Sequence, residues 1–190
     1  MIGTYDDALA ALRAGHVVAI PTDTVYGVAA SLSAAPSLFA VKQRPRDVAL
    51  PVLIADASQL AGVVRAPLPS RARDLIAEWW PGPLTVVLDR DPSFTVDLGG
   101  DARSARTVGV RLPAADLVRT LCGAVGPLAV TSANLHGRPT PPDATGVEAQ
   151  LGDAVAVVVD GGTCTGAPST VVRVASDGTV TVLREGAIRV

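Results

Sequence analysis

Short apolar runs rich in Val, Ile and Ala alternate along the chain with segments whose apolar residues recur at helical spacing. The runs predict buried strands and the other segments predict helices, so we expect an α/β fold. We expect strands at residues 16–20, 51–55, 84–88, 108–112, 128–131, 155–159, 170–174 and 179–183. We expect helices at 4–15, 38–41, 70–80 and 114–122, and a helical turn at 147–151.

The two ends of the chain carry the clearest local signals. Thr4 precedes two aspartates, as at the start of a helix, and Gly15 stands where that helix would end. Near the other end, Asp177-Gly178 separates two β-branched runs, which predicts a hairpin. Hairpin strands are antiparallel, so we predict a twisted mixed parallel and antiparallel sheet with flanking helices.

Composition favours one domain, because a chain of 190 residues can bury a single core. We therefore expect residues 1–190 to form one domain. Neither a signal peptide nor an apolar run of the ~20 residues of a membrane span is present, so we expect a cytoplasmic protein. Cys122 and Cys164 lie far apart and are predicted to be reduced. The net charge of −2 argues against a dedicated nucleic-acid binder.

A single lysine, Lys42, stands among fifteen arginines, within Lys42-Gln43-Arg44-Pro45. Lysine offers a compact point charge and arginine a planar fork of donors, so the two are not interchangeable. Compositional bias could leave one lysine by chance, and basic residues at a helix end often only complement the helix dipole. The other interpretation is that the pair binds a polyanion such as a nucleoside triphosphate.

Four polar stretches interrupt the apolar pattern, and ligand groups in open α/β sheets lie at strand ends. They are residues 21–27, 42–45, 131–134 and 168–170. A capped turn, a solvated helix end or a tight loop is the structural alternative for each. Ser132 and Asn134 can hydrogen-bond a phosphate or an adenine edge without ionising. The sequence contains no P-loop, dinucleotide-binding glycine motif or nucleophile elbow, and His136 near Ser132 lacks the context of a Ser/His nucleophile.

Seven segments of the chain occur in the order found in one known family. They are Pro21-Thr22-Asp23-Thr24-Val25-Tyr26-Gly27, Lys42-Gln43-Arg44-Pro45, Trp80-Pro81-Gly82-Pro83-Leu84-Thr85, Val108-Gly109-Val110-Arg111-Leu112-Pro113, Thr131-Ser132-Ala133-Asn134, Pro168-Ser169-Thr170-Val171-Val172 and Leu183-Arg184-Glu185-Gly186-Ala187. Together they resemble the YrdC-like threonylcarbamoyl-AMP synthases. The resemblance implies a YrdC-like twisted mixed sheet with flanking helices and a large open cavity.

The resemblance also implies an activity. Family members make L-threonylcarbamoyl-adenylate from L-threonine, bicarbonate and ATP with release of pyrophosphate, the first step of threonylcarbamoyladenosine formation at position 37 of tRNA. The tRNA-modification machinery would take up the adenylate. The implied ATP-binding residues are Lys42, Arg44, Thr107, Ser132, Asn134, Thr140 and Arg184. The implied threonine-binding residues are Thr24, Arg111 and Ser169, with the Arg111 fork suited to the carboxylate.

The chemistry of this reaction explains such a residue set. A carbamate must approach the α-phosphorus of ATP, so two anions meet in one site, and Lys42, Arg44 and Mg²⁺ arriving with ATP would neutralise them. No side-chain nucleophile or general base is required, because positioning alone can contribute ~7–11 kcal/mol. The sequence assigns no metal ligands.

Some features depart from the family pattern or suit other functions. Asp23 stands where Glu is usual and Val28 where Leu is usual, and the segment between Gly27 and Lys42 is about three residues shorter than expected from the resemblance. A chain ending at Val190 would be the short form of the family. The alternatives are an RNA-binding module, for double-stranded RNA, tRNA or ribosome maturation, and a carbamoyl-transfer domain of the hydrogenase-maturation type.

Overall fold

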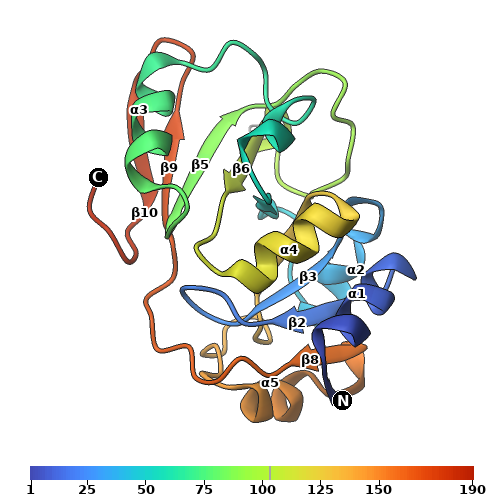
Figure 1. Ribbon diagram of the computed structural model, residues 1–190. Helices are drawn as coiled ribbons and strands as arrows, with labels where there is room; N and C mark the ends of the chain where they lie inside the picture. The colour runs from blue at the N-terminus through green and yellow to red at the C-terminus, as the bar shows by residue number, and fades with distance from the viewer. Residues whose placement is uncertain (103) are drawn as a thin grey trace.

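A twisted ten-stranded sheet runs through the whole computed structural model, which describes residues 1–102 and 104–190 (Figure 1). The sheet has the order β1-β8-β2-β3-β7-β4-β6-β5-β9-β10. The strands are β1 (Ile2–Gly3), β2 (Val18–Ile20), β3 (Gly27–Ser31), β4 (Val52–Leu53), β5 (Leu84–Asp89), β6 (Thr107–Arg111), β7 (Leu128–Ser132), β8 (Val157–Val159), β9 (Thr170–Val174) and β10 (Val180–Arg184).

The sheet is mixed, as the sequence predicted. The pairs β1–β8, β2–β8, β4–β6 and β5–β9 are parallel. The pairs β2–β3, β3–β7, β4–β7, β5–β6 and β9–β10 are antiparallel. The predicted hairpin joins β9 to β10, and Gly178 in its turn has a φ of +87°, which favours glycine.

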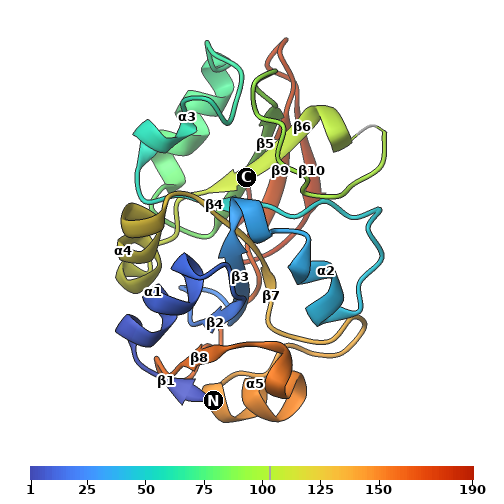
Figure 2. The same ribbon diagram turned by 90° about the vertical axis from the view of Figure 1, so that its right-hand side faces the viewer.

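Helices flank the sheet, and two of them cover one face of its centre. The helices are α1 (Tyr5–Arg13), α2 (Ser37–Lys42), α3 (Ser70–Trp79), α4 (Asp116–Val125) and α5 (Ala144–Leu151), with 3₁₀ turns η1 (Leu32–Ala34), η2 (Ala57–Leu60), η3 (Ser104–Arg106) and η4 (Gly152–Ala154). Leu12 of α1 and Leu121 of α4 are buried in one apolar cluster with Ile20 of β2. Figure 2 shows α1 and α4 together on one side of the sheet and α2 on the other.

The α1 helix begins as its sequence predicted. The Thr4 side chain accepts a hydrogen bond from the Asp7 backbone N–H, and the Asp7 carboxylate accepts one from the Thr4 N–H. Cys122 and Cys164 are both free thiols in the structure. Across the described residues, none of the helices combines the length and apolar character needed to span a bilayer.

Three elements differ from the sequence-based expectation. The apolar pattern did not predict β1 and β3, and α5 is a full helix where only a turn at 147–151 was expected. In β3, two alanines and a terminal serine give weak strand propensity, yet the strand is held between β2 and β7. In α5, Thr145 and Gly146 are poor helix formers, but the Asp143 carboxylate caps the first turn by accepting from the Gly146 N–H at 2.8 Å.

Candidate active site

A pocket of about 500 Å³ opens over one face of the sheet, lined by β5, β6 and β9 on one side and by β7 and residues 48–51 on the other. Alternate residues of a strand point to the same face, so Thr107, Gly109 and Arg111 of β6 all line it. A Cβ on Gly109 would lie 3.3 Å from the Thr85 Cγ2, so glycine keeps this floor open.

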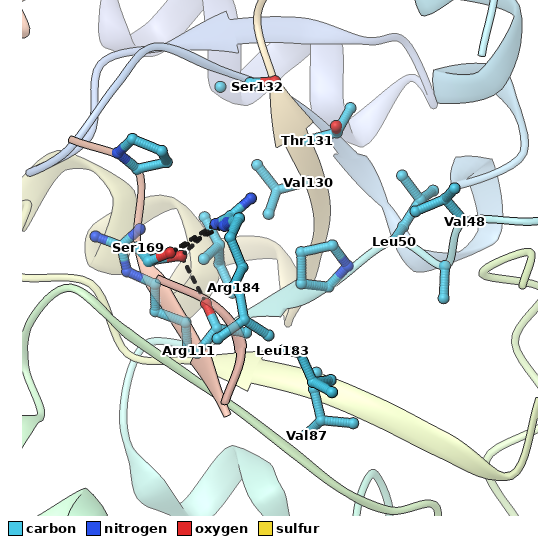
Figure 3. A pocket seen from close by; sticks show the side chains of 18 of the residues that line it. Val48, Leu50, Val87, Arg111, Val130, Thr131, Ser132, Ser169, Leu183 and Arg184 are labelled. Atoms are coloured by element: carbon cyan, nitrogen blue, oxygen red, sulfur yellow. Dashed lines mark hydrogen bonds between the residues drawn. The ribbon is translucent and has the colours of Figure 1, made fainter. Parts of the chain in front are cut away.

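Apolar side chains form opposite walls of the pocket. Figure 3 shows Val48, Leu50 and Val130 on one side and Val87 and Leu183 on the other. Both Leu183 and its neighbour Arg184 line the pocket, although successive strand residues normally face opposite ways. The register of β10 shifts between Val182 and Arg184, and this irregularity permits the change of direction.

Lys42 is the last residue of α2, and its side chain reaches the end of β7. The ammonium donates to the Ser132 carbonyl at 2.6 Å, to the Ser132 Oγ at 3.0 Å and to the Asn134 Oδ1 at 3.0 Å. These three bonds use all three N–H groups of the ammonium. The shortened segment before Lys42 therefore still places this side chain against the polar stretch at 131–134.

Asn134 connects Lys42 to the loop that follows β7. Its Oδ1 also accepts from the Thr140 hydroxyl at 3.2 Å, and its Nδ2 donates to the carbonyls of Leu135 and Arg138. The amide thus fixes the loop and the lysine together. Lys42, Asn134 and Thr140 lie behind Ser132 and are not among the residues that line the pocket.

Burial changes the titration of Lys42, which is only 2% exposed. Desolvation, with a smaller contribution from Arg44, lowers the pKa of Lys42 to about 8 from its ordinary value of 10.5. Between these two pH values the unfolded chain binds more protons at this residue than the folded chain does. The free energy of unfolding therefore gains a contribution from Lys42 as the pH rises through this window.

We expect this contribution to distinguish wild type from Lys42→Met in urea denaturation at pH 7.5 and pH 10. The wild type should gain up to about 3 kcal/mol relative to the variant, since one pKa unit corresponds to about 1.4 kcal/mol. The variant is the control for every other group whose protonation changes between these two pH values. An equal change in both proteins would show that the Lys42 ammonium is not desolvated.

At the other end of the pocket, Arg111 forms a polar cluster with Asp23, Thr24 and Gly82. Its guanidinium donates through Nη2 to Asp23 at 2.6 Å, through Nη1 to the Thr24 hydroxyl at 3.0 Å and through Nε to the Gly82 carbonyl at 3.0 Å. Burial lowers the pKa of Arg111 from its ordinary value, and the Asp23 carboxylate opposes that change. Within the described residues, one N–H on each terminal nitrogen remains for a ligand.

Ser169 and Arg184 lie beside this cluster. The Arg184 guanidinium donates to the Ser169 carbonyl through Nε and Nη2, and to the Ser169 Oγ through Nη2 at 3.0 Å (Figure 3). Burial is the largest cause that lowers the pKa of Arg184, and the charges of Arg111 and Arg44 lower it further. The guanidinium groups of Arg44, Arg111 and Arg184 therefore create a combined positive potential in the pocket, which suits an anionic ligand.

Arg44 follows the helix that carries Lys42. Gln43 has a φ of +51° and ends α2, and the Arg44 N–H then bonds to the Phe39 carbonyl, which closes the turn. The Arg44 Nη1 donates weakly to the Thr131 hydroxyl at 3.4 Å. Its Nε is buried and has no hydrogen-bond partner within the described part of the chain. A buried donor of this kind in a pocket wall favours an anionic partner.

The structure brings most of the predicted site residues to one pocket. Those that line it are Thr24, Arg44, Thr107, Arg111, Ser132, Ser169 and Arg184. Four other residues line the pocket without having been predicted as ligands from the sequence: Thr22, Thr85, Thr131 and Arg173. Thr22 and Thr131 stand in two of the polar stretches, and alternation along the strands at 84–88 and 170–174 could have indicated Thr85 and Arg173.

The carboxylates do not gather into a metal site. Across residues 1–102 and 104–190, no group of three His, Cys, Asp or Glu side chains is placed to hold a metal ion. Asp101 is the acidic side chain among those that line the pocket. Mg²⁺ usually binds through one or two carboxylates together with substrate phosphates, so this donor set suits an ion that arrives with a nucleotide.

Taken together, the mixed α/β sheet and its arginine- and hydroxyl-lined pocket define a class of domain suited to binding anionic small molecules. The chain belongs to the Sua5/YciO/YrdC family, whose sequence model, described as telomere recombination, matches residues 10–186. The predicted resemblance and the predicted mixed-sheet fold are thereby confirmed.

Known relatives and solved structures place the chain within this family. A Mycobacterium tuberculosis relative is 43% identical over 158 residues, which are 82% of this chain and 71% of that protein. The threonylcarbamoyl-AMP synthase of Bacillus subtilis is 41% identical over 95% of this chain and 53% of its own length. Pyrococcus abyssi Sua5 complexed with L-threonine superposes with a TM-score of 0.84 at 32% identity, over 96% of this chain and 54% of that one. The chain thus spans about half the length of the latter two proteins.

Proposed function

We propose that the protein is an L-threonylcarbamoyladenylate synthase, which joins L-threonine, bicarbonate and ATP and releases pyrophosphate. The observation that carries this proposal is the pocket in which three guanidinium groups converge with the hydroxyls of Thr24, Ser132 and Ser169. The names of the curated relatives and the L-threonine complex of P. abyssi Sua5 support it. The product would pass to the tRNA-modification machinery.

We assign the two ends of the pocket to different substrates. Arg111, Thr24 and Ser169 would bind threonine, with the two remaining N–H groups of Arg111 directed to the carboxylate. Arg44, Ser132 and Thr107 would contact ATP, and Arg184, which donates to Ser169, would contact it where the two substrates meet. The apolar walls would hold the adenine. Lys42, Asn134 and Thr140 would act from behind Ser132 by holding it in place and adding positive charge.

The reaction then requires assembly more than side-chain chemistry. The threonine amine combines with bicarbonate to give a carbamate and water. A carbamate oxygen attacks the α-phosphorus of ATP, and the bond from that phosphorus to the leaving pyrophosphate breaks. The shared field of the arginines lowers the repulsion between the carbamate and the phosphates. Mg²⁺ bound to the phosphates would neutralise further charge.

Pyrophosphate release should depend on both co-substrates of ATP. Purified protein with Mg²⁺ and ATP should release pyrophosphate only when both L-threonine and bicarbonate are present, as measured by a coupled phosphate assay. Omission of either, or replacement of L-threonine by D-threonine, should return the signal to background. Equal release without threonine would contradict the proposal, and salt-dependent RNA binding without turnover would support the RNA-binding alternative instead.

A further inference from the structure

Thr85 is a buried hydroxyl residue on the floor of the pocket that the proposed mechanism does not use. It is only 3% exposed and belongs to β5, where it pairs with Val171 of β9. Its Oγ1 lies 2.9 Å from the Ser169 Oγ. Within the described part of the chain, Ser169 is the hydrogen-bond partner that the Thr85 hydroxyl has. Buried hydroxyls rarely leave their proton unbonded, so the direction of this bond can be derived.

Arg184 determines part of the hydrogen bonding at Ser169. Its Nη2 lies 3.0 Å from the Ser169 Oγ, and a guanidinium can only donate. The Ser169 oxygen therefore accepts one bond from Arg184 and has one acceptor position and one proton left. If Thr85 donates, the second acceptor position is filled and the Thr85 proton is satisfied. The Ser169 proton is then the one free to enter the pocket.

The opposite direction leaves a less favourable arrangement. If Ser169 donated to Thr85, the Thr85 proton would need an acceptor elsewhere, although the residue as a whole is only 3% exposed. The Ser169 oxygen would also keep an unfilled acceptor position beside a cation. A hydroxyl that accepts from a charged donor becomes a better donor itself, because hydrogen bonds in a chain polarise one another. A chain of hydrogen bonds from Arg184 to Ser169 and from Ser169 to the ligand uses that effect.

We propose that Thr85 is a positioning residue that donates to Ser169 and thereby directs the Ser169 hydroxyl proton toward a carboxylate or carbamate oxygen of bound threonine. This inference rests on the proposed function for the identity of the ligand. Thr85 does not touch the substrate in this arrangement. It acts by fixing which group of Ser169 faces the pocket, so that threonine meets a donor beside the Arg111 guanidinium.

The test compares Thr85→Val, Ser169→Ala and the double variant. Valine keeps the shape of threonine and removes the hydroxyl. We expect the Kd and the KM for L-threonine to rise about fivefold to tenfold in Thr85→Val, with kcat within about twofold, since ground-state binding is what weakens. Ser169→Ala should weaken binding more, about thirtyfold, and the double variant should match Ser169→Ala, because Thr85 acts through Ser169.

Two further variants separate positioning from general damage. Thr85→Ser keeps the hydroxyl and should restore threonine binding to within about threefold of wild type. Thr181→Val, at an exposed residue of β10 that does not line the pocket, is the matched control and should bind threonine as wild type does. Thermal unfolding of each protein verifies that the fold is intact.

Several outcomes would overturn the inference. Unchanged threonine affinity in Thr85→Val would do so, as would additive losses in the double variant or a loss in Thr85→Val that equals or exceeds that in Ser169→Ala. The last result would mean that Thr85 itself donates to the ligand. Calorimetric threonine binding is measured independently of turnover. Wild-type protein that binds threonine without releasing pyrophosphate would contradict the proposed function alone, whereas wild-type protein that binds no threonine would contradict both.

Discussion

Lys42→Met should lower kcat/KM for ATP about a hundredfold while leaving the fold intact. The ammonium holds both Ser132 and Asn134, and Ser132 lines the pocket. Removal of one preorganised donor from a site of developing negative charge typically costs 10²–10³ in rate. Here the loss would combine a displaced Ser132 hydroxyl with the absence of one positive charge near the phosphates.

Stability should change much less, for reasons visible in the same contacts. The Ser132 carbonyl also accepts from the Asn134 N–H at 2.9 Å, and the Asn134 Oδ1 also accepts from Thr140. Both acceptors therefore keep a partner when Lys42 is replaced. Methionine fills a similar volume without a buried charge, and removal of that charge offsets part of the lost hydrogen bonding.

The measurement is pyrophosphate release as a function of ATP concentration, with urea denaturation at pH 7.5 beside it. Arg13→Met on the exposed end of α1 is the matched control, since it removes one positive charge far from the pocket. The control should retain wild-type kinetics. Unchanged turnover in Lys42→Met would show that the lysine has no role in the reaction. An unfolded variant would show that its main role is to stabilise the fold.

The sequence singled out Lys42 and the polar stretch at 131–134, and their role in binding ATP stays a prediction. Lys42 and the polar stretch at 131–134 stood out because each interrupts an apolar pattern, and the structure joins them. The partners of Arg111 were not predicted, because Asp23 and Gly82 lie far from it along the chain. Which distant strand ends meet depends on sheet order, and apolar periodicity does not encode that order.

The same distinction applies to the fold. Strands such as β6 and β9 are rich in valine and were predicted from their own residues, whereas β3 owes its conformation to pairing on both sides. For Thr85 the strand was predicted correctly, but the role of the side chain was not. From the sequence, Thr85 appeared to be one more β-branched residue in an apolar run. Only the distance of 2.9 Å between its Oγ1 and the Ser169 Oγ indicates a role for its hydroxyl.

Arg111→Lys should weaken L-threonine binding by a factor of about a hundred or more. Arginine has five N–H donors, of which three bind Asp23, Thr24 and the Gly82 carbonyl. Lysine has three donors, so the same protein partners could use all of them and leave none for the substrate. The change keeps the positive charge beside Asp23, and therefore removes the bidentate fork without leaving a buried carboxylate unpaired.

Arg111→Ala would not separate these effects. The Asp23 and Arg111 side chains are 15% and 7% exposed, so truncation would leave a poorly solvated carboxylate without its cation. Breaking a buried pair in this way costs about 3–5 kcal/mol of stability. Loss of activity in that variant could then reflect unfolding, which is why the lysine variant is the sharper test of carboxylate recognition.

Arg119→Lys provides the matched control for this experiment. Arg119 also pairs with an aspartate, Asp116, but on the surface of α4 and outside the pocket. Exposed pairs contribute little, so this variant should bind threonine as wild type does and unfold at the same urea concentration. Calorimetry with L-threonine measures the affinities directly. Wild-type affinity in Arg111→Lys would show that the guanidinium serves Asp23 and the loop at Thr24, and that the substrate carboxylate is bound by another group.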